Sequence, residues 1–121
     1  MSRQRSSPPV TLTDLGSDRT RLFDLAWCLS LRIQIHLHAG AHHDAIEAAE
    51  AARALMDLTG DLRGHATVSL DLVAAQIATG LLTQAPEVLE PAVPLLRDIG
   101  AYSAASRGER LLSEASGEVH A

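Results

Sequence analysis

Four glycines recur at one fixed interval in this chain, Gly40, Gly60, Gly80 and Gly100, and each follows an apolar stretch with helical spacing. Glycine enters the left-handed backbone region at the lowest steric cost, so it is the usual residue just past the end of a helix. Stops that lie 20 residues apart divide the chain into five helical segments. The interval predicts a helical repeat, while it indicates no particular chemistry.

The repeating unit is a pair of helices, because residues 20–72 match residues 60–112 after a shift of 40 residues. Small apolar, large apolar and acidic positions recur in phase. A period between about 20 and 50 residues is typical of solenoids, whose units bury their apolar faces by stacking. We expect an all-α fold of stacked antiparallel helical hairpins, about five helices in all. The matching pairs are Leu22/Leu62, Ala26/Ala66, Gly40/Gly80, Ala45/Ala85, Glu47/Glu87, Glu50/Glu90, Ala52/Ala92, Leu55/Leu95, Gly60/Gly100 and Leu72/Leu112.

Length and composition bound the class of protein. The 121 residues are enough for one domain with a modest core, and this core must be aliphatic because aromatic residues make up only 2% of the chain. A net charge of −5 argues against a phosphate-binding surface, so we expect no direct contact with nucleic acid. The single Cys28 lies in an apolar run and is expected to be a small buried residue of a reducing compartment.

No apolar stretch is long enough to cross a membrane, and residues 1–10 lack the apolar segment of a secretory signal. We therefore expect a soluble, cytoplasmic protein that makes no membrane contact.

The domain boundaries follow from changes in composition. Residues 1–17 are rich in Ser, Pro and Arg and lack apolar periodicity, which predicts a disordered N-terminal arm. We expect residues 18–116 to form the helical repeat domain and residues 117–121 to be a flexible tail. Asp18 is the expected N-cap of the first helix, whose inward stripe comprises Leu22, Leu25, Ala26, Leu29, Ile33 and Leu37.

The first helix has a second apolar side. Phe23, Trp27 and Leu31 widen its apolar surface, so this helix either lies between neighbours or exposes a side that a missing neighbour would cover.

Later helices carry recognisable start and break signals. Asp61 is the expected cap of the third helix, and Gly64 in its first turn allows a close approach. Thr83 is the expected start signal of the fourth helix, which Pro91 and Pro94 should make kinked or short. The last segment mixes apolar residues with Ser, Arg and Glu, as a terminal helix facing solvent requires.

These features resemble tetratricopeptide repeats. The turns His38-Ala39-Gly40-Ala41 and Ala78-Thr79-Gly80-Leu81, followed by Asp44-Ala45 and Gln84-Ala85, are similar to the glycine and the alanine that open the second helix of each unit in that family. The ends Leu58-Thr59-Gly60-Asp61 and Asp98-Ile99-Gly100-Ala101 resemble stretched repeats in the helical C-terminal regions of large bacterial transcriptional regulators and signalling ATPases. The period of 40 residues, in place of the family's 34, and the aliphatic residues at its Trp and Tyr positions are departures.

The resemblance implies a non-catalytic scaffold that binds a protein or peptide within a bacterial regulatory system. The family's ligands lie along a concave face lined by the first helix of each pair. The residues of those helices that fall off the apolar stripe are the candidate binding residues on this basis: Arg32, Gln34, His36, Asp71 and Gln76.

One cluster of side chains suggests metal chemistry, namely His36, His38, His42, His43 and Asp44. His38 and His42 have the spacing of two ligands on one helix, but Gly40 should end the helix between them and direct the rings apart. Histidines at the rim of a hairpin are the favoured interpretation. No nucleophile with a base, phosphate-binding loop or carboxylate pair is present, so we expect neither catalysis nor a cofactor.

Two alternatives to the scaffold are open. The five helices could close into a bundle around a metal or small ligand, with the histidines or the proline kink lining the cavity. The chain could also form a homodimer through the uncovered apolar surfaces at the ends of the stack, with Phe23, Trp27 and Leu31 at the interface.

Overall fold

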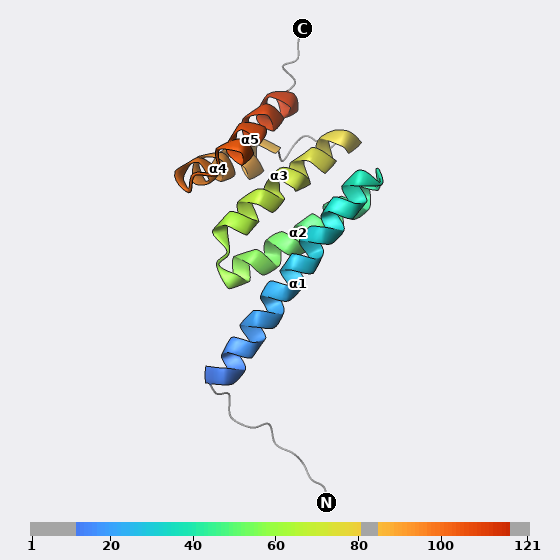
Figure 1. The fold of residues 1–121 in the computed structure, drawn as a ribbon. Coiled ribbons are helices and arrows are strands. Elements are labelled where there is room, and N and C mark those ends of the chain that lie inside the picture. Colours follow the sequence, from blue (N-terminus) through green and yellow to red (C-terminus); the bar gives the residue numbers. More distant parts are fainter. Residues whose placement is uncertain (1–11, 81–84, 117–121) are drawn as a thin grey trace, which may run out of the picture.

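The computed structural model describes residues 12–80 and 85–116, with side chains from residue 18 onward. This part of the chain consists of α-helices and turns and contains no strand. The helices are α1 (Leu12–His38), α2 (His42–Thr59), α3 (Leu62–Thr79), α4 (Ala85–Asp98) and α5 (Tyr102–Ala115). α1, α3 and α5 run in one direction, and α2 and α4 return in the opposite one (Figure 1). The expected all-α class with five helices is confirmed.

Glycine ends the first four helices, as the interval predicts. Gly40 and Gly60 have φ values of 75°, and Gly80 and Gly100 have values of 83°. After Gly40, Gly60 and Gly100, the next residue donates its N–H to the carbonyl five positions back, for example Asp61 to Met56 at 2.9 Å and Ala101 to Leu96 at 2.8 Å. This bond belongs to the Schellman motif, which satisfies carbonyls that the helix end leaves free.

The start of the first helix differs from the prediction. α1 begins at Leu12, so residues 12–17 of the predicted arm are helical and Asp18 lies inside the helix. Residues 12–17 include Gly16, but a lone glycine in a helix costs only about 1 kcal/mol, which a long helix tolerates. Residues 1–11, the start signal Thr83 and the tail 117–121 lie outside the described residues.

α3 is the central helix. It packs against α2 on one side and against α4 and α5 on the other, and it also touches α1. Val68 and Leu72 join a core with α1 and α2, whereas Ala66, Leu70 and Val73 join a second core with α4 and α5. Within the described ranges, α1 contacts neither α4 nor α5.

The two internal prolines are accommodated within α4. The helix continues through Pro91 and Pro94, both of which are exposed. With 14 residues it is shorter than α2 and α3, which have 18 each. A proline on the solvent side of a helix leaves a carbonyl without its N–H partner, and water can bind that carbonyl.

Candidate functional site

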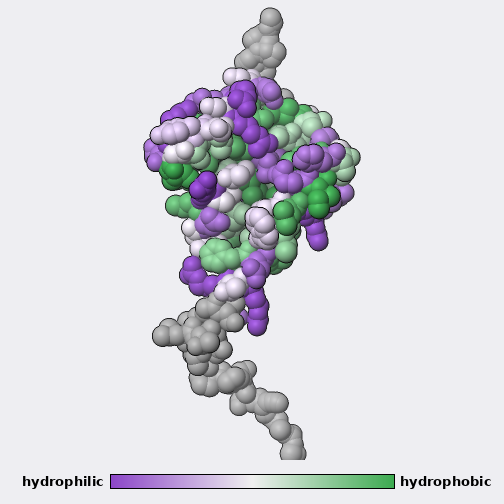
Figure 2. Space-filling view, in the orientation of Figure 1, coloured by the Kyte–Doolittle hydropathy of each residue, from purple (hydrophilic) through white to green (hydrophobic). Residues whose placement is uncertain are grey.

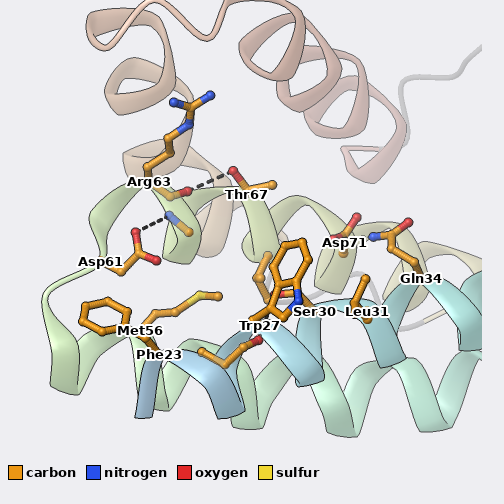
Figure 3. Close-up of a pocket in the computed structure, with 13 residues that line it drawn as sticks. Phe23, Trp27, Ser30, Leu31, Gln34, Met56, Asp61, Arg63, Thr67 and Asp71 are labelled. Atoms are coloured by element: carbon orange, nitrogen blue, oxygen red, sulfur yellow. Dashed lines mark hydrogen bonds between the residues drawn. The ribbon is translucent and has the colours of Figure 1, made fainter. Parts of the chain in front are cut away.

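A groove with a volume of about 530 Å³ lies between α1 and α3. These are the first helices of two consecutive hairpins, and Met56 of α2 lies at the base of the groove (Figure 3). The residues that line this α1–α3 groove are Phe23, Ala26, Trp27, Ser30, Leu31 and Gln34 of α1, Met56, and Asp61, Arg63, Gly64, Thr67, Val68 and Asp71 at or in α3.

The α1 wall of the groove is aromatic and uncovered. Phe23, Trp27 and Leu31 follow each other by one turn and are 41%, 64% and 46% exposed. They form the second apolar side expected from the sequence, and no helix of the described chain covers it. Arg19 lies over the Phe23 ring, 5.8 Å from its centroid, so a cation–π contact occupies the end of this wall.

The hydroxyl groups in the groove are satisfied by their own helices. Ser30 Oγ donates to the Ala26 carbonyl at 3.0 Å, and Thr67 Oγ1 donates to the Arg63 carbonyl at 2.9 Å. Side-chain bonds to the carbonyl four residues back are a common way for Ser and Thr to sit in a helix. The groove therefore presents mainly methyl groups and rings, and apolar contact is the dominant interaction it offers.

The start of α3 forms one end of the groove, and the predicted cap at Asp61 and close approach at Gly64 are both confirmed. Asp61 caps the helix, because its Oδ1 accepts the Gly64 N–H at 2.9 Å. A Cβ at Gly64 would lie 2.4 Å from Asp61 Oδ2, so the glycine makes room for the capping carboxylate. The Asp61 carboxylate is thus engaged with the helix end, where negative charge is favourable.

Asp71 is held from two directions. Gln34 Nε2 of α1 donates to Asp71 Oδ2 at 3.0 Å, and Arg107 Nη1 of α5 donates to Asp71 Oδ1 at 3.1 Å. The Asp71 side chain is only 7% exposed. The structure thus brings together two of the five candidate binding residues, Gln34 and Asp71. Asp71 was expected on an open face, and the burial corrects this, because α1 and α5 flank α3 at that level.

Gln76 is also buried, with 4% exposure, and its Oε1 has no hydrogen-bond partner among the described residues. The prediction that it faces away from the core is wrong. The reason is the central place of α3: a helix with neighbours on opposite sides buries positions that an amphipathic helix would expose.

Arg32 and His36 do not line the α1–α3 groove. They share a shallow hollow on another side of α1 with Asp44 and Glu47 of α2. Helical rotation explains this, because positions 32 and 34 point about 200° apart. The structure therefore separates the five candidates into a groove pair, a buried residue and a pair on the opposite side of α1.

The histidine cluster is spread over the end of the first hairpin. His38 Nδ1 lies 2.8 Å from the Gln34 carbonyl, and His43 is exposed. His42 is half-buried, and its Nδ1 has no hydrogen-bond partner in the described chain. His65 Nε2 lies 3.4 Å from Asp57 Oδ1, at the other end of α2. Across residues 18–80 and 85–116, no three His, Cys, Asp or Glu side chains gather as a metal site would require.

Cys28 is exposed, which corrects the expectation of burial. Leu25, placed on the inward stripe by its spacing, is 49% exposed. Both residues lie on the side of α1 that faces away from α2, and no described helix precedes α1 to cover them.

Apolar side chains interrupt the polar surface on the face that α1, α3 and α5 present in Figure 2. None of the five described helices is long and apolar enough to cross a membrane. A comparison of the whole chain with protein families, curated proteins and solved structures finds no match.

Proposed function

We propose that this chain is a non-catalytic helical scaffold, similar to tetratricopeptide repeats, that binds a protein or peptide segment in the α1–α3 groove. The observation that carries this proposal is the uncovered wall of Phe23, Trp27 and Leu31, which faces α3 across a groove whose hydroxyl groups and carboxylates are bonded within the protein. Large exposed aromatic residues beside a concavity are typical anchors of protein recognition.

The order of helix contacts favours a scaffold over a closed bundle. Each helix packs on the next one along the chain, and the alternate helices α1, α3 and α5 touch in sequence. A bundle closed around a ligand would bring α1 against α4 or α5, and the described residues make no such contact. Neither α4 nor α5 contributes a residue to the lining of the groove, so they leave it accessible to an extended or helical peptide.

The charges at the groove indicate the chemistry of its ligand. The two carboxylates that line it are engaged internally, Asp61 by the α3 terminus and Asp71 by Gln34 and Arg107. Arg63 forms no ion pair with any described residue, and its guanidinium points away from the base of the groove (Figure 3). The ligand we propose is a peptide with a large apolar anchor for the aromatic wall and a nearby Asp or Glu for Arg63.

Selection from a random-peptide phage library on the immobilised chain tests this proposal. A selected peptide is labelled, and its affinity is measured by fluorescence anisotropy. Trp27→Ala should weaken binding by at least about tenfold, because it removes an interface anchor. Arg63→Glu should lower the affinity for peptides that carry an acidic residue. The loss should be smaller for the same peptides with that Asp or Glu replaced by Asn or Gln.

Leu58→Ala is the matched control, because Leu58 is 75% exposed and lies outside the groove. The affinity of this variant should stay within about twofold of the original, as expected for a truncation outside the contact. Selection of no peptide, or of peptides indifferent to Trp27→Ala, would count against the groove as the binding site. A regulatory system in the bacterial cytoplasm is the setting that we propose, on the resemblance alone.

A further inference from the structure

α1 carries an unusual share of the apolar surface. Of the nine large apolar side chains exposed in the described chain, five lie on this helix: Phe23, Leu25, Trp27, Leu31 and Ile35. Phe23, Trp27 and Leu31 line the α1–α3 groove, whereas Leu25 and Ile35 do not. At about 100° per residue, Leu25 and Ile35 lie on opposite flanks of the exposed Cys28. We call this surface, formed by Asp24, Leu25, Cys28, Leu31, Arg32 and Ile35, the outer face of α1.

The repeat shows that the outer face occupies a position that is covered elsewhere in the molecule. A shift of 40 residues places Cys28 on Val68 and Ile35 on Ala75. Val68 and Ala75 are 2% and 0% exposed in α3, and Val68 packs in the core shared with α1 and α2. In α1 the same positions have no preceding hairpin among the described helices, so an apolar packing surface is left open.

The opposite end of the stack does not offer a complementary surface. The exposed residues of α5 are mostly hydroxyl-bearing or charged, and Tyr102 is the single large apolar side chain exposed on this helix. Head-to-tail stacking of α1 on α5 of another copy would bury apolar side chains against these polar groups, which is unfavourable. A second outer face, turned about Cys28, sets Leu25 and Leu31 against Leu31 and Leu25 and fits better. The exposed polar residues of α5 are Ser103, Ser106, Glu109, Arg110, Ser113 and Glu114.

The outer face has the pattern of a surface that pairs with itself. Leu25 and Leu31 lie three residues to either side of Cys28, and Asp24 and Arg32 lie four residues to either side. Neither Asp24 nor Arg32 forms an ion pair within the described chain. In an antiparallel pair of helices related by a two-fold axis at Cys28, each Asp24 meets Arg32 of the other copy, and each Leu25 meets Leu31.

We propose that the outer face of α1 binds the outer face of a second copy of this chain, antiparallel and centred on Cys28. The partner is a like copy because the charges are complementary only after two-fold rotation. Packed helices lie about 8–10 Å apart with Cα radii of about 2.3 Å, which brings the two Cys28 Cα atoms to about 3.4–5.4 Å. That separation overlaps the range of a disulfide. This contact shares Leu31 with the α1–α3 groove, but its evidence does not depend on peptide binding there.

Light scattering after size-exclusion chromatography, over a range of protein concentrations, tests the association. The original chain should show the mass of a dimer, and Leu25→Glu should show that of a monomer at the same concentration. Leu58→Glu is the matched control, since Leu58 is an exposed leucine of α2 away from this face, and it should remain a dimer. Circular dichroism of each variant establishes that the helices persist.

Charge exchange tests the antiparallel register. Asp24→Arg places two arginines opposite each other, and Arg32→Asp places two aspartates opposite each other, so each variant alone should dissociate more readily. A mixture of the two should associate again, because each copy then supplies the charge that the other needs. Oxidation with copper phenanthroline in air, which removes one electron and one proton from each thiol, should join the mixed pair through Cys28.

Three results would overturn the proposal. The original chain could remain a monomer, as expected if the outer face binds a different protein or a preceding hairpin. A dimer could survive Leu25→Glu, which would place the contact elsewhere. The mixture of charge variants could fail to associate and to cross-link, which would exclude the two-fold axis at Cys28.

Discussion

At the scale of single residues, the clearest determinant that the 20-residue pattern does not reveal is Gly108. This glycine is buried in α5 and falls outside the series of helix stops. A Cβ built there would lie 2.6 Å from Val93 Cγ2 and 3.1 Å from Leu70 Cδ2. Its role is therefore close packing of α5 against α4 and α3.

Gly108→Ala should lower the free energy of unfolding by about 1–2 kcal/mol, because overpacking a filled core costs about 1–3 kcal/mol and the higher helix propensity of alanine offsets up to about 1 kcal/mol of this. Urea denaturation followed by circular dichroism measures this. In the Val93→Ala background, Gly108→Ala should lower the free energy of unfolding by less than it does in the original chain. The smaller side chain at position 93 leaves room for the added methyl group. Equal losses in the two backgrounds would contradict this account of the contact.

Local signals in the sequence were sufficient where a residue acts on its own backbone. The positive φ of the four spaced glycines and the Asp61 cap both follow from neighbours within one turn. The burial of Asp71 and Gln76 did not follow, since each depends on helices distant in sequence. One signal was available for Asp71: a shift of 40 residues places it on Leu31 and on Leu111, both apolar.

At the scale of helices, the sequence pattern agrees best with the structure where one side of a helix is buried. In α2 the alanines at helical spacing lie on that side, with Ala45, Ala49 and Ala52 fully buried. The pattern was insufficient for α1 and α3, for opposite reasons. α3 packs against helices on several sides, so polar side chains on it are buried. α1 packs mainly against α2, so apolar side chains on its other sides are exposed. The number of neighbours of a helix is a property of the stack, and the periodicity of one segment does not encode it.

The prolines of α4 give a prediction at this scale. Pro94 cannot donate to the carbonyl of Glu90, and a proline inside a helix costs up to about 3 kcal/mol relative to alanine. Pro94→Ala should therefore raise the free energy of unfolding by about 1–3 kcal/mol, measured by urea denaturation. Little packing is lost, because Pro94 is exposed.

Pro86→Ala provides the comparison for Pro94→Ala. Pro86 is the second residue of α4, where the backbone N–H has no helical partner in any case. Both substitutions raise the conformational entropy of the unfolded chain by a similar amount. The difference between their effects on the free energy of unfolding therefore reports the helical hydrogen bond. If Pro86→Ala stabilised the protein as much as Pro94→Ala, the missing bond would not be the cause.

At the scale of the whole molecule, the Asp71 carboxylate joins the three parallel helices α1, α3 and α5. Arg107→Leu should lower the free energy of unfolding by about 1–2 kcal/mol, measured by thermal or urea denaturation. A hydrogen bond to a charged group contributes about 1.5–3 kcal/mol, and we expect less here because the Arg107 side chain is 38% exposed.

The double variant Arg107→Leu/Asp71→Leu should be more stable than Arg107→Leu. It removes the buried carboxylate that the single variant leaves with Gln34 alone, and it restores the residue found at the equivalent repeat positions. A double variant less stable than the single one would show that Asp71 contributes to stability without Arg107.

The central place of α3 has a consequence for how the molecule unfolds. Stacked repeats gain stability chiefly from the interfaces between neighbours, and here a single helix belongs to both apolar cores. Melting of α3 would remove Val68 and Leu72 from one core and Ala66, Leu70 and Val73 from the other. We therefore expect the two halves to unfold in one cooperative transition, and a protease that cuts within α3 to destabilise both.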